Sequence, residues 1–361
     1  MVIYFIVTND LSYDQRMIRV CSSLSREGYT IKLVGRKLNN SVPLLNESFQ
    51  QKRIECLFNR GKLFYCEFNL RVFFYLLFKK MDCICAIDLD TIIPCYFISR
   101  LKKIKRVYDA HELFCEMNEI VSRRNIYRIW KRVERFSVPK FTKGYTVSQP
   151  IADEMDKMYK VKYEVIRNVS IKRDVSIPEK KERYILYQGA VNEGRSFETI
   201  IPAMKTINAR LIICGDGNFM QKAKQLVLEY GLNDKIIFKG YLSPGELQNY
   251  TLGAWVGINI IDKKGLNNYY SLANRFFDYM HSGVPQLCTD FPAYREINEP
   301  FKIAVLIADM SPENIATQLN ILLYDEMLHA ELQENCIKAR EVFNWQNEEI
   351  KLISFYKSLL G

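Results

Sequence analysis

Short apolar runs alternate with amphipathic stretches along the first half of the chain. Residues 2–7 form a continuous apolar run typical of a buried strand, and residues 14–27 have the spacing of an amphipathic helix that ends at Gly28. Residues 31–34 form the next apolar run. This order of strand, helix and strand indicates a doubly wound α/β domain. Further strands are expected at residues 83–87, 106–108, 145–147 and 163–166.

The alternation starts again in the second half, after a charged stretch at residues 171–183 that contains Pro178 and is expected to be a linker. A chain of 361 residues is long for one hydrophobic core, so we predict two α/β domains of similar size with a cleft between them. We place them at residues 1–172 and 173–342, followed by a last segment at 343–361. The second-half strands are expected at residues 184–188, 210–214, 235–238, 255–261, 286–288 and 303–307, with helices at 196–207, 244–250 and from 312 onward.

The composition is that of a soluble globular protein, with 48% hydrophobic and 25% charged residues. No stretch approaches the ~20 apolar residues that a membrane-spanning helix needs. The 10 cysteines include no Cys-x-x-Cys pair and there are only 3 histidines, so the sequence does not predict a metal site. So many thiols without a secretory leader are typical of a reducing cytosol, and we expect a cytoplasmic location.

The net charge of +10 is unevenly distributed along the chain. Residues 1–180 carry 33 Lys and Arg against 20 Asp and Glu, whereas residues 181–361 carry 18 against 21. Such an excess of cations suits an anionic surface or substrate, although a merely solvated face can also be basic. Residues 61–80 are rich in aromatic side chains and flanked by cations, which fits either a core helix or a helix in a membrane interface. Together with basic clusters at 102–106 and 123–135, they raise peripheral membrane contact as a hypothesis.

Polar residues follow several predicted strands of the first half. The turn after the first strand, residues 8–14, has no glycine, which disfavours a nicotinamide-binding fingerprint. Asp88 and Asp90 follow one apolar run, and His111 follows Asp109 at the end of the next. Open α/β sheets bind ligands at such carboxyl ends. A histidine there can act as an acid, a base or a hydrogen-bond donor to a hydroxyl, although a lone histidine is more often structural.

A loop with two glycines, Gly189-Ala-Val-Asn-Glu-Gly194-Arg195-Ser196, lies between a predicted strand and a predicted helix. Glycines let backbone N–H groups approach a phosphate, and the helix amino terminus adds a partial positive charge. Arg195 can donate two parallel hydrogen bonds to phosphate oxygens. The loop also nearly matches the P-loop pattern, with residues 258–262 as a possible second strand. Because Arg does not replace the compact ammonium of a P-loop, a nucleoside triphosphatase is the weaker alternative.

The stretch at residues 265–285 joins a polar loop to a helix that Gly283 ends. Arg275 and Asp278 stand three residues apart, a spacing that places them on one helical face near its start. The cation can contact a phosphate, and the carboxylate can accept hydrogen bonds from the hydroxyls of a sugar. The ordinary alternative is a surface salt bridge.

These stretches, in this order, resemble the retaining nucleotide-sugar glycosyltransferases of the GT-B fold, in the broad glycosyltransferase family 4 group. The resemblance covers nearly the whole chain. It implies two Rossmann-like doubly wound domains that face each other across a cleft, a donor bound by the second domain, and a last helix, 348–360, packed back on the first. The strings that carry it are Leu11–Arg19, Asp88–Thr91, Tyr108–Glu112, Tyr187–Arg195, Cys214–Gly217, Ser271–Met280 and Gly283–Pro285.

The resemblance also implies a set of site residues. Gly189, Arg195 and Arg275 would hold the diphosphate, Asp278 would bind the ribose, and His111 would approach the donor sugar. His111, Arg195 and Arg275 are therefore the expected catalytic residues. The wider donor-binding set is Gly189, Asn192, Gly194, Gly215, Tyr270, Ser271, Leu272, Asn274 and Asp278, and the acceptor-side set is Asn9, Asp14, Arg16 and Asp88. Asp88-Leu89-Asp90 is similar to the metal-binding Asp-x-Asp of the other large glycosyltransferase fold. Here the triplet lies in the first of two predicted domains, which is not the context of that motif, so no metal is expected.

Three positions depart from the family's pattern. Asp278 stands where the family has Glu and is shorter by about 1.5 Å. Tyr270 stands where another Glu contacts the hydroxyls of the donor sugar, and Ser196 where Gly is usual. Since Tyr270 puts sugar identity and activity in question, a non-catalytic nucleotide-sugar binder stays an alternative, as does a sugar-nucleotide epimerase of the same fold.

By this resemblance we expect a metal-independent, retaining hexosyltransferase that uses a UDP- or GDP-linked sugar as co-substrate and has no bound cofactor. Its acceptor would be a carbohydrate or a lipid-linked glycan, as in surface polysaccharide or glycolipid biosynthesis. Any contact with the inner face of the cell membrane would be peripheral. We expect no nucleic acid as a partner.

Overall fold

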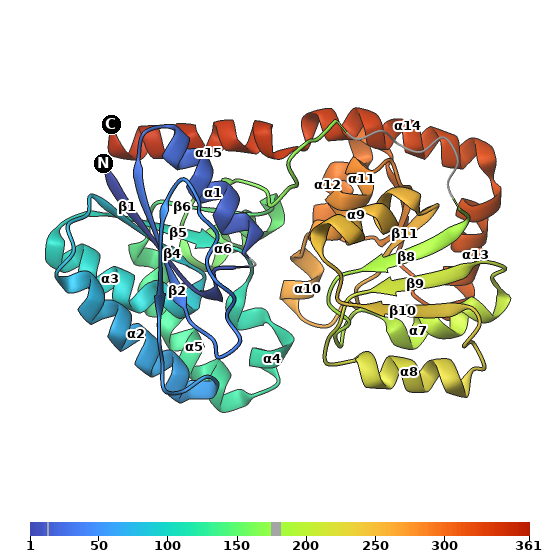
Figure 1. Cartoon of the computed structure of the whole chain (residues 1–361), viewed down its shortest axis with the longest axis horizontal. Helices are drawn as coiled ribbons and strands as arrows, with labels where there is room; N and C mark the ends of the chain where they lie inside the picture. The colour runs from blue at the N-terminus through green and yellow to red at the C-terminus, as the bar shows by residue number, and fades with distance from the viewer. Residues whose placement is uncertain (13, 175–181) are drawn as a thin grey trace. The chain divides into compact units, whose positions relative to one another are not determined.

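The computed structural model of the protein describes residues 1–12, 14–174 and 182–361. The chain forms two compact units, one made of residues 1–168 with 348–361 and the other of residues 169–347 (Figure 1). Residues 175–181 of the predicted linker, Pro178 among them, lie outside the described residues.

In the described part of the first unit, seven parallel strands form one sheet in the order β3-β2-β1-β4-β5-β6-β7. The chain starts at β1 and moves first to one edge and then to the other, which is the doubly wound arrangement. All five residues of β4 are buried, as expected for a strand covered on both faces. The strands are β1 (Val2–Asp10), β2 (Thr30–Arg36), β3 (Gln50–Ile54), β4 (Cys83–Ile87), β5 (Lys105–Ala110), β6 (Gly144–Thr146) and β7 (Glu164–Val165).

Helices cover both faces of this sheet. Neighbouring side chains of β1 point to opposite faces: Phe5 packs on Tyr356, with ring centroids 6.0 Å apart, and Tyr4 lies near Tyr75. Tyr356 belongs to the last helix, whose residues 348–361 are part of the first unit. The helices are α1 (Gln15–Arg26), α2 (Gly61–Leu77), α3 (Ile92–Lys102), α4 (Asn118–Val121), α5 (Arg124–Ser137), α6 (Gln149–Tyr159) and α15 (Trp345–Leu360).

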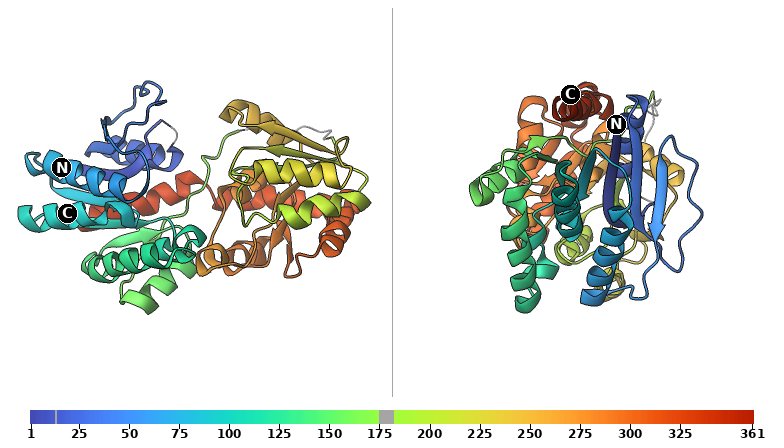
Figure 2. Two further views of the ribbon diagram at one scale, coloured as in Figure 1. Left: turned by 90° about the horizontal axis from the view of Figure 1, so that it is seen from below. Right: turned by 90° about the vertical axis from the view of Figure 1, so that its left-hand side faces the viewer.

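Helices α2, α3 and α5 lie side by side on the face away from α15 (Figures 1 and 2). Tyr65 of α2 packs edge-on against Trp130 of α5 at 5.3 Å between ring centroids, and Tyr96 of α3 packs against Phe136 of α5 at 5.5 Å. Within the described residues, no helix is long and apolar enough to cross a membrane.

The second unit repeats the arrangement with six parallel strands, counted over its described residues, in the order β10-β9-β8-β11-β12-β13. The direction of winding reverses between β8 and β11, and open sheets bind ligands outside the carboxyl ends of strands at such a reversal. The strands are β8 (Tyr184–Gln188), β9 (Arg210–Cys214), β10 (Ile236–Gly240), β11 (Val256–Asn259), β12 (Gln286–Thr289) and β13 (Ala304–Ile307). The helices are α7 (Phe197–Ala203), α8 (Met220–Glu229), α9 (Pro244–Gly253), α10 (Leu266–Tyr270), α11 (Asn274–His281), α12 (Pro292–Phe301), α13 (Pro312–Tyr324) and α14 (Glu326–Val342).

The predicted fold class, two Rossmann-like α/β units, is confirmed. The strands predicted at 184–188 and 210–214 match β8 and β9 residue for residue. The helix predicted at 196–207 is shorter because its helical hydrogen bonding gives way to a 3-10 turn after Pro202 and Ala203. The stretch at 265–285 contains two helices, α10 and α11, instead of one.

Candidate functional site

Two loops close on each other at the carboxyl ends of β8 and β9. Gly189 donates its N–H to the carbonyl of Cys214 at 2.9 Å, and Val191 donates to the carbonyl of Asp216 at 3.0 Å. Gly215 has φ +149°, and a Cβ at this position would lie 1.8 Å from the carbonyl oxygen of Gly189. The predicted glycines Gly189 and Gly215 are therefore brought together, and the contact requires the absence of a side chain at 215.

The rest of the predicted glycine loop is tied to its neighbours. The side-chain oxygen of Asn192 accepts a hydrogen bond from the backbone of Asn218 at 3.0 Å. The carbonyl of Gly194 accepts one from the N–H of Asp262 at 2.9 Å, and Asp262 in turn accepts one from the amide of Asn268 at 3.0 Å. These bonds join the loops after β8, β9 and β11 into one surface at the end of the sheet.

Arg275 is the charged residue most firmly held in this surface. It is buried, and its Nε donates to Asn259 Oδ1 at 2.8 Å. Its Nη1 donates to the hydroxyl of Tyr187 and to the carbonyl of Gln188, both at 3.0 Å. Its Nη2 is buried with no hydrogen-bond partner among the described residues. A Cβ on Gly189 would lie 3.0 Å from Nη1, so the guanidinium sits directly beside the glycine turn. A fixed cation with an unused N–H pair is suited to an oxygen-rich anion.

Asp278 lies one helical turn after Arg275 and is partly exposed. Its Oδ1 accepts a hydrogen bond from Ser170 Oγ at 2.7 Å, and its Oδ2 accepts one from Gln188 Nε2 at 3.0 Å. Gln188 is oriented by Thr251, whose hydroxyl donates to Gln188 Oε1 at 2.7 Å. A carboxylate oriented in this way is an acceptor group of the kind that binds hydroxyls.

The remaining predicted donor residues line the same region. Arg195 is half-buried, and its N–H donates to the carbonyl of Asn192 at 3.3 Å. Ser196 has φ +56° and precedes α7. Tyr270 ends α10, with its ring 5.2 Å from that of Tyr269. Ser271 and Leu272 are half-buried in the segment between α10 and α11, and Asn274 is the exposed first residue of α11.

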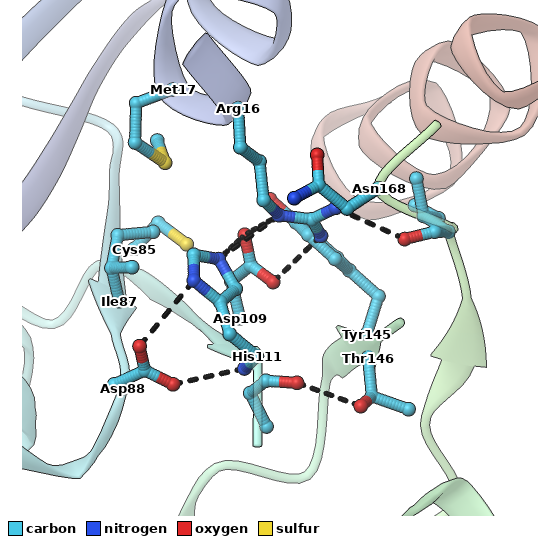
Figure 3. A network of polar contacts seen from close by, with 12 residues as sticks. Arg16, Met17, Cys85, Ile87, Asp88, Asp109, His111, Tyr145, Thr146 and Asn168 are labelled. Carbon is cyan, nitrogen blue, oxygen red and sulfur yellow. Dashed lines mark hydrogen bonds and ion pairs between the residues drawn. The ribbon is translucent and has the colours of Figure 1, made fainter. Parts of the chain in front are cut away.

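In the first unit, the predicted residues His111 and Arg16 belong to one polar network (Figure 3). The Nε2 atom of His111 lies 3.0 Å from Asp109 Oδ2, and its Nδ1 lies 3.3 Å from Asp88 Oδ2. Asp88 Oδ1 also accepts a hydrogen bond from the backbone N–H of His111 at 2.9 Å. Arg16 Nη2 donates to Asp109 Oδ1 at 2.9 Å, and Arg16 Nη1 donates to the carbonyl of Ile166 at 3.2 Å.

The charges of this network fix the protonation of His111. Burial alone would lower the pKa of His111, but the carboxylates of Asp109 and Asp88 raise it to about 9. Burial would raise the pKa of Asp109, but Arg16 and His111 lower it below its usual value. Burial raises the pKa of Asp88 to about 7, against the opposing effect of His111. Arg16 Nε lies 2.9 Å from His111 Nε2 and 3.3 Å from Asp109 Oδ2. Because a protonated Nε2 cannot accept a hydrogen bond, Asp109 Oδ2 is the acceptor for both N–H groups when His111 is charged. The network thus holds an imidazolium between two carboxyl groups.

The predicted acceptor-side residues divide into two groups. Asn9 donates its amide to Asp14 Oδ2 at 3.0 Å, and Asp14 Oδ1 accepts from the N–H of Met17, which caps α1. Arg16 is 4% exposed and every nitrogen of its guanidinium has a protein partner. The buried position of Arg16 is therefore that of a residue that holds Asp109 and His111 in place. Contact of the acceptor-side set with an acceptor stays a prediction.

The Asp-x-Asp triplet does not converge on one point. Asp88 is bonded to His111, whereas Asp90 Oδ2 accepts a hydrogen bond from Thr8 at 2.6 Å. Within the described residues, no group of three or more His, Cys, Asp or Glu is arranged to hold a metal ion.

Sequence reasoning missed the residues that position Arg275 and Asp278. Asn259 and Gln188 end β11 and β8 and are both buried. A buried amide at the carboxyl end of a central strand is unusual, and that is the signal that could have identified them.

We expect His111 to stay protonated through neutral pH. Its folded-state pKa of about 9 exceeds the ordinary value of 6.5, so its stabilising contribution is complete below pH 6.5 and is lost as the pH rises through about 9. In an NMR titration of ring-labelled histidine, the resonance that His111→Gln removes should titrate near pH 9. His281 is the internal control, because burial lowers its pKa. A His111 midpoint at or below pH 6.5 would contradict the charged network.

Residues 169–341 match the family described as Glycosyl transferases group 1. Among curated proteins, the chain is similar to the O-antigen chain mannosyltransferase RfbU of Salmonella typhimurium, with 26% identity over 173 residues that cover 45% of this chain and 46% of that protein. The chain spans about half the length of the curated relatives it matches.

Solved structures resemble the chain over its whole length. Sucrose-phosphate synthase of Thermosynechococcus elongatus has a TM-score of 0.84 and 15% identity, with 99% of each chain covered. HepE of Anabaena in complex with UDP-glucose has a TM-score of 0.74 and 12% identity, with 99% of this chain and 100% of that chain covered. At these identities the likeness concerns the fold, which is the GT-B fold.

Proposed function

We propose that this chain, whose residues 169–341 form a group 1 glycosyltransferase domain, transfers a sugar from a nucleoside diphosphate sugar to a hydroxyl of an acceptor. In this proposal the anomeric configuration is retained, no metal or other cofactor takes part, and the leaving group is the nucleoside diphosphate. The transferred group is a hexose and the donor is UDP- or GDP-linked.

The observation that carries the proposal is the arrangement around Arg275. A buried guanidinium whose Nη2 has no hydrogen-bond partner in the described part of the chain lies beside the Gly189 turn, at the point where the winding of the second sheet reverses. Glycine lets an anion approach the backbone closely, and the guanidinium is already held by Asn259 and Tyr187, so little reorganisation is needed when charge develops. The leaving diphosphate gains negative charge in the transition state, and such a fixed cation stabilises that charge more than it stabilises the ground state.

The other donor contacts follow from the same surface. Arg195, in the glycine loop, would share the diphosphate with Arg275. The carboxylate of Asp278, oriented by Ser170 and Gln188, is a hydrogen-bond acceptor of the kind that suits the hydroxyls of a ribose. Tyr270 would lie at the donor sugar and contribute to the choice of sugar.

His111 would contact the donor sugar from the first unit. Both of its ring nitrogens already face carboxyl groups, at 3.0 and 3.3 Å. We therefore assign it a fixed positive charge rather than the role of a mobile proton carrier. Its place in the network would make Asp109 and Arg16 positioning residues.

The acceptor in this proposal is a carbohydrate or a lipid-linked glycan of surface polysaccharide or glycolipid biosynthesis. The similarity to an O-antigen chain mannosyltransferase supports a glycan acceptor. The match to that protein covers under half of each chain, so it supports the class of acceptor and does not identify the acceptor itself. Reaction would take place on the cytoplasmic side of the membrane.

The test is turnover of UDP-glucose, UDP-galactose and GDP-mannose with an alkyl glycoside as acceptor. We expect release of UDP or GDP from at least one donor, dependent on the acceptor, and a product whose anomeric configuration, read by NMR, is that of the donor. Conversion of the donor sugar without release of nucleotide would instead identify an epimerase. Tight donor binding without release or conversion would identify a nucleotide-sugar binder, and hydrolysis of ATP with Mg²⁺ alone would identify a triphosphatase.

A further inference from the structure

The outer face of α2 carries a stripe of large apolar side chains. Phe64, Phe68, Val72 and Leu76 are buried and fix the inner face of the helix. On the opposite face, four side chains at spacings of seven, four and four residues form one stripe along the helix. They are Leu63, Leu70 and Phe74 of the helix and Phe78, the residue that directly follows it, and they are 59%, 54%, 60% and 83% exposed.

The neighbouring helix α3 also exposes large apolar side chains. Lys102 at the end of α3 donates to the carbonyl of Leu77 at the end of α2, at 2.8 Å, so the two helices end together. Phe97 and Leu101, one turn apart on α3, are also exposed. We call the six side chains on the two helices the α2–α3 face: Leu63, Leu70, Phe74, Phe78, Phe97 and Leu101. Exposed aromatic side chains that cluster in this way usually mark an interaction site.

Cations surround the apolar residues. Lys80, Lys103 and Lys105 are exposed near the shared end of the two helices, and no Asp or Glu occurs between residues 91 and 108. Asp82 is exposed beside them, and its carboxylate accepts a hydrogen bond from the backbone N–H of Val2. The carboxylate of α2 that lies in the stripe, Glu67, is already bonded to Arg71 and to two backbone N–H groups. The partner of this surface should therefore be anionic and should also accept large apolar groups.

A bilayer that contains anionic lipids has both properties. Phe and Leu side chains can enter the boundary between head groups and acyl chains, while Lys side chains reach the anionic head groups. A nucleic acid would bind the cations through its phosphates, but its backbone offers no apolar partner for the exposed Leu side chains of the surface. A second copy of this chain would place two clusters of lysines near each other. Charge and apolarity together favour the lipid surface.

We propose that the α2–α3 face binds the chain peripherally to membranes that contain anionic lipids. The contact lies wholly within the first unit and does not depend on the proposed transfer reaction, so either can fail without the other. It would bring the enzyme to the surface at which a lipid-linked acceptor resides.

The test is co-sedimentation of the full chain with vesicles of phosphatidylcholine alone and of phosphatidylcholine with phosphatidylglycerol. We expect binding to the anionic vesicles, weakening as salt rises, and little binding to the neutral ones. The pair Lys80→Glu and Lys103→Glu should weaken binding at least about tenfold, since each lysine at an anionic surface is worth roughly fivefold. The pair Phe74→Ser and Phe78→Ser should also weaken it about tenfold or more.

Matched controls lie on α8 of the second unit. Lys222 and Lys224 are exposed there, and Leu228 is 66% exposed. The pair Lys222→Glu and Lys224→Glu, and separately Leu228→Ser, should leave vesicle binding within about twofold of the unmodified chain. Unchanged thermal melting would show that the variants are folded.

Three results would overturn the proposal. One is equal binding to neutral and anionic vesicles, or none to either. Another is an unaltered affinity when the α2–α3 face is changed in folded variants. The third is a different occupant: a dimer in vesicle-free solution that Phe74→Ser and Phe78→Ser dissociate, or binding to duplex DNA that exceeds vesicle binding and is lost in the same variants.

Discussion

Replacing Arg275 by Met is expected to lower kcat/KM for the nucleoside diphosphate sugar by about 10²- to 10³-fold, the usual effect of removing one preorganised donor to a developing negative charge. The Nη2 atom is the buried nitrogen left for the ligand, and Met keeps the bulk of the stem without the cation. Arg275→Lys should give an intermediate loss, because an ammonium keeps the charge but cannot donate as a planar fork.

The loss must be separated from unfolding, since Arg275 also donates to Asn259 and to the carbonyl of Gln188. Leaving these acceptors unpaired costs about 1–3 kcal/mol of stability. Activity is therefore compared at a temperature where circular dichroism shows each variant to be folded. Arg210→Met is a matched control, because Arg210 is exposed at the start of β9 and forms a weak ion pair with Glu182 at 3.9 Å. A folded Arg275→Met variant with kcat/KM within threefold of the unmodified chain would contradict the proposed role.

Gly215→Ala is expected to destabilise the second unit by about 3 kcal/mol and to abolish nucleotide binding. A Cβ at 215 would lie 1.8 Å from the carbonyl oxygen of Gly189, so the loops after β8 and β9 must separate. The φ of +149° adds backbone strain for any L side chain. Because the displaced partner is backbone, no side-chain rotation relieves the overlap.

Urea unfolding followed by circular dichroism measures this effect. Gly245→Ala is the matched control: Gly245 lies in the first turn of α9, and a Cβ there would meet nothing within 4 Å. Alanine has the higher helix propensity, so the control should be unchanged or more stable by up to about 1 kcal/mol. Equal urea midpoints for Gly215→Ala and the unmodified chain would mean that the two loops are not in contact.

The parts of the fold that the sequence predicted are those whose stability comes from burial. Residues 184–188 are all buried, and a short apolar run between polar loops identifies them as a strand. The edge strand β3, Gln50–Ile54, was not predicted. Of its five residues Ile54 alone is buried, so the segment has no apolar run, and its pairing with β2 holds it in place. The break between α10 and α11 was also not predicted. No Pro or Gly marks it, and the N–H of Ala273 instead donates to Tyr294, 21 residues away.

For the candidate site, the sequence identified the ligand candidates but not the residues that orient them. The spacing of Arg275 and Asp278 identified both as ligand candidates, and both lie at the expected end of the sheet. The bonds that orient them come from Asn259 and Gln188, on other strands, and no local pattern shows such partners. Arg16 illustrates the limit most clearly. The resemblance placed it on the acceptor side, and the structure shows it buried on Asp109, 93 residues further along the chain, a partner that the sequence does not indicate.

A thermal-shift screen of nucleotides measures whether the second unit binds a nucleoside diphosphate sugar. A ligand present at ~100 times its Kd stabilises the folded state by about 2.7 kcal/mol, which shifts the melting temperature of a domain this size by several degrees. We expect such a shift with UDP or GDP and with the corresponding sugar nucleotide, without Mg²⁺, and we expect folded Arg275→Met to lose it. Stabilisation by ATP with Mg²⁺ alone, or an equal shift in Arg275→Met, would contradict this expectation.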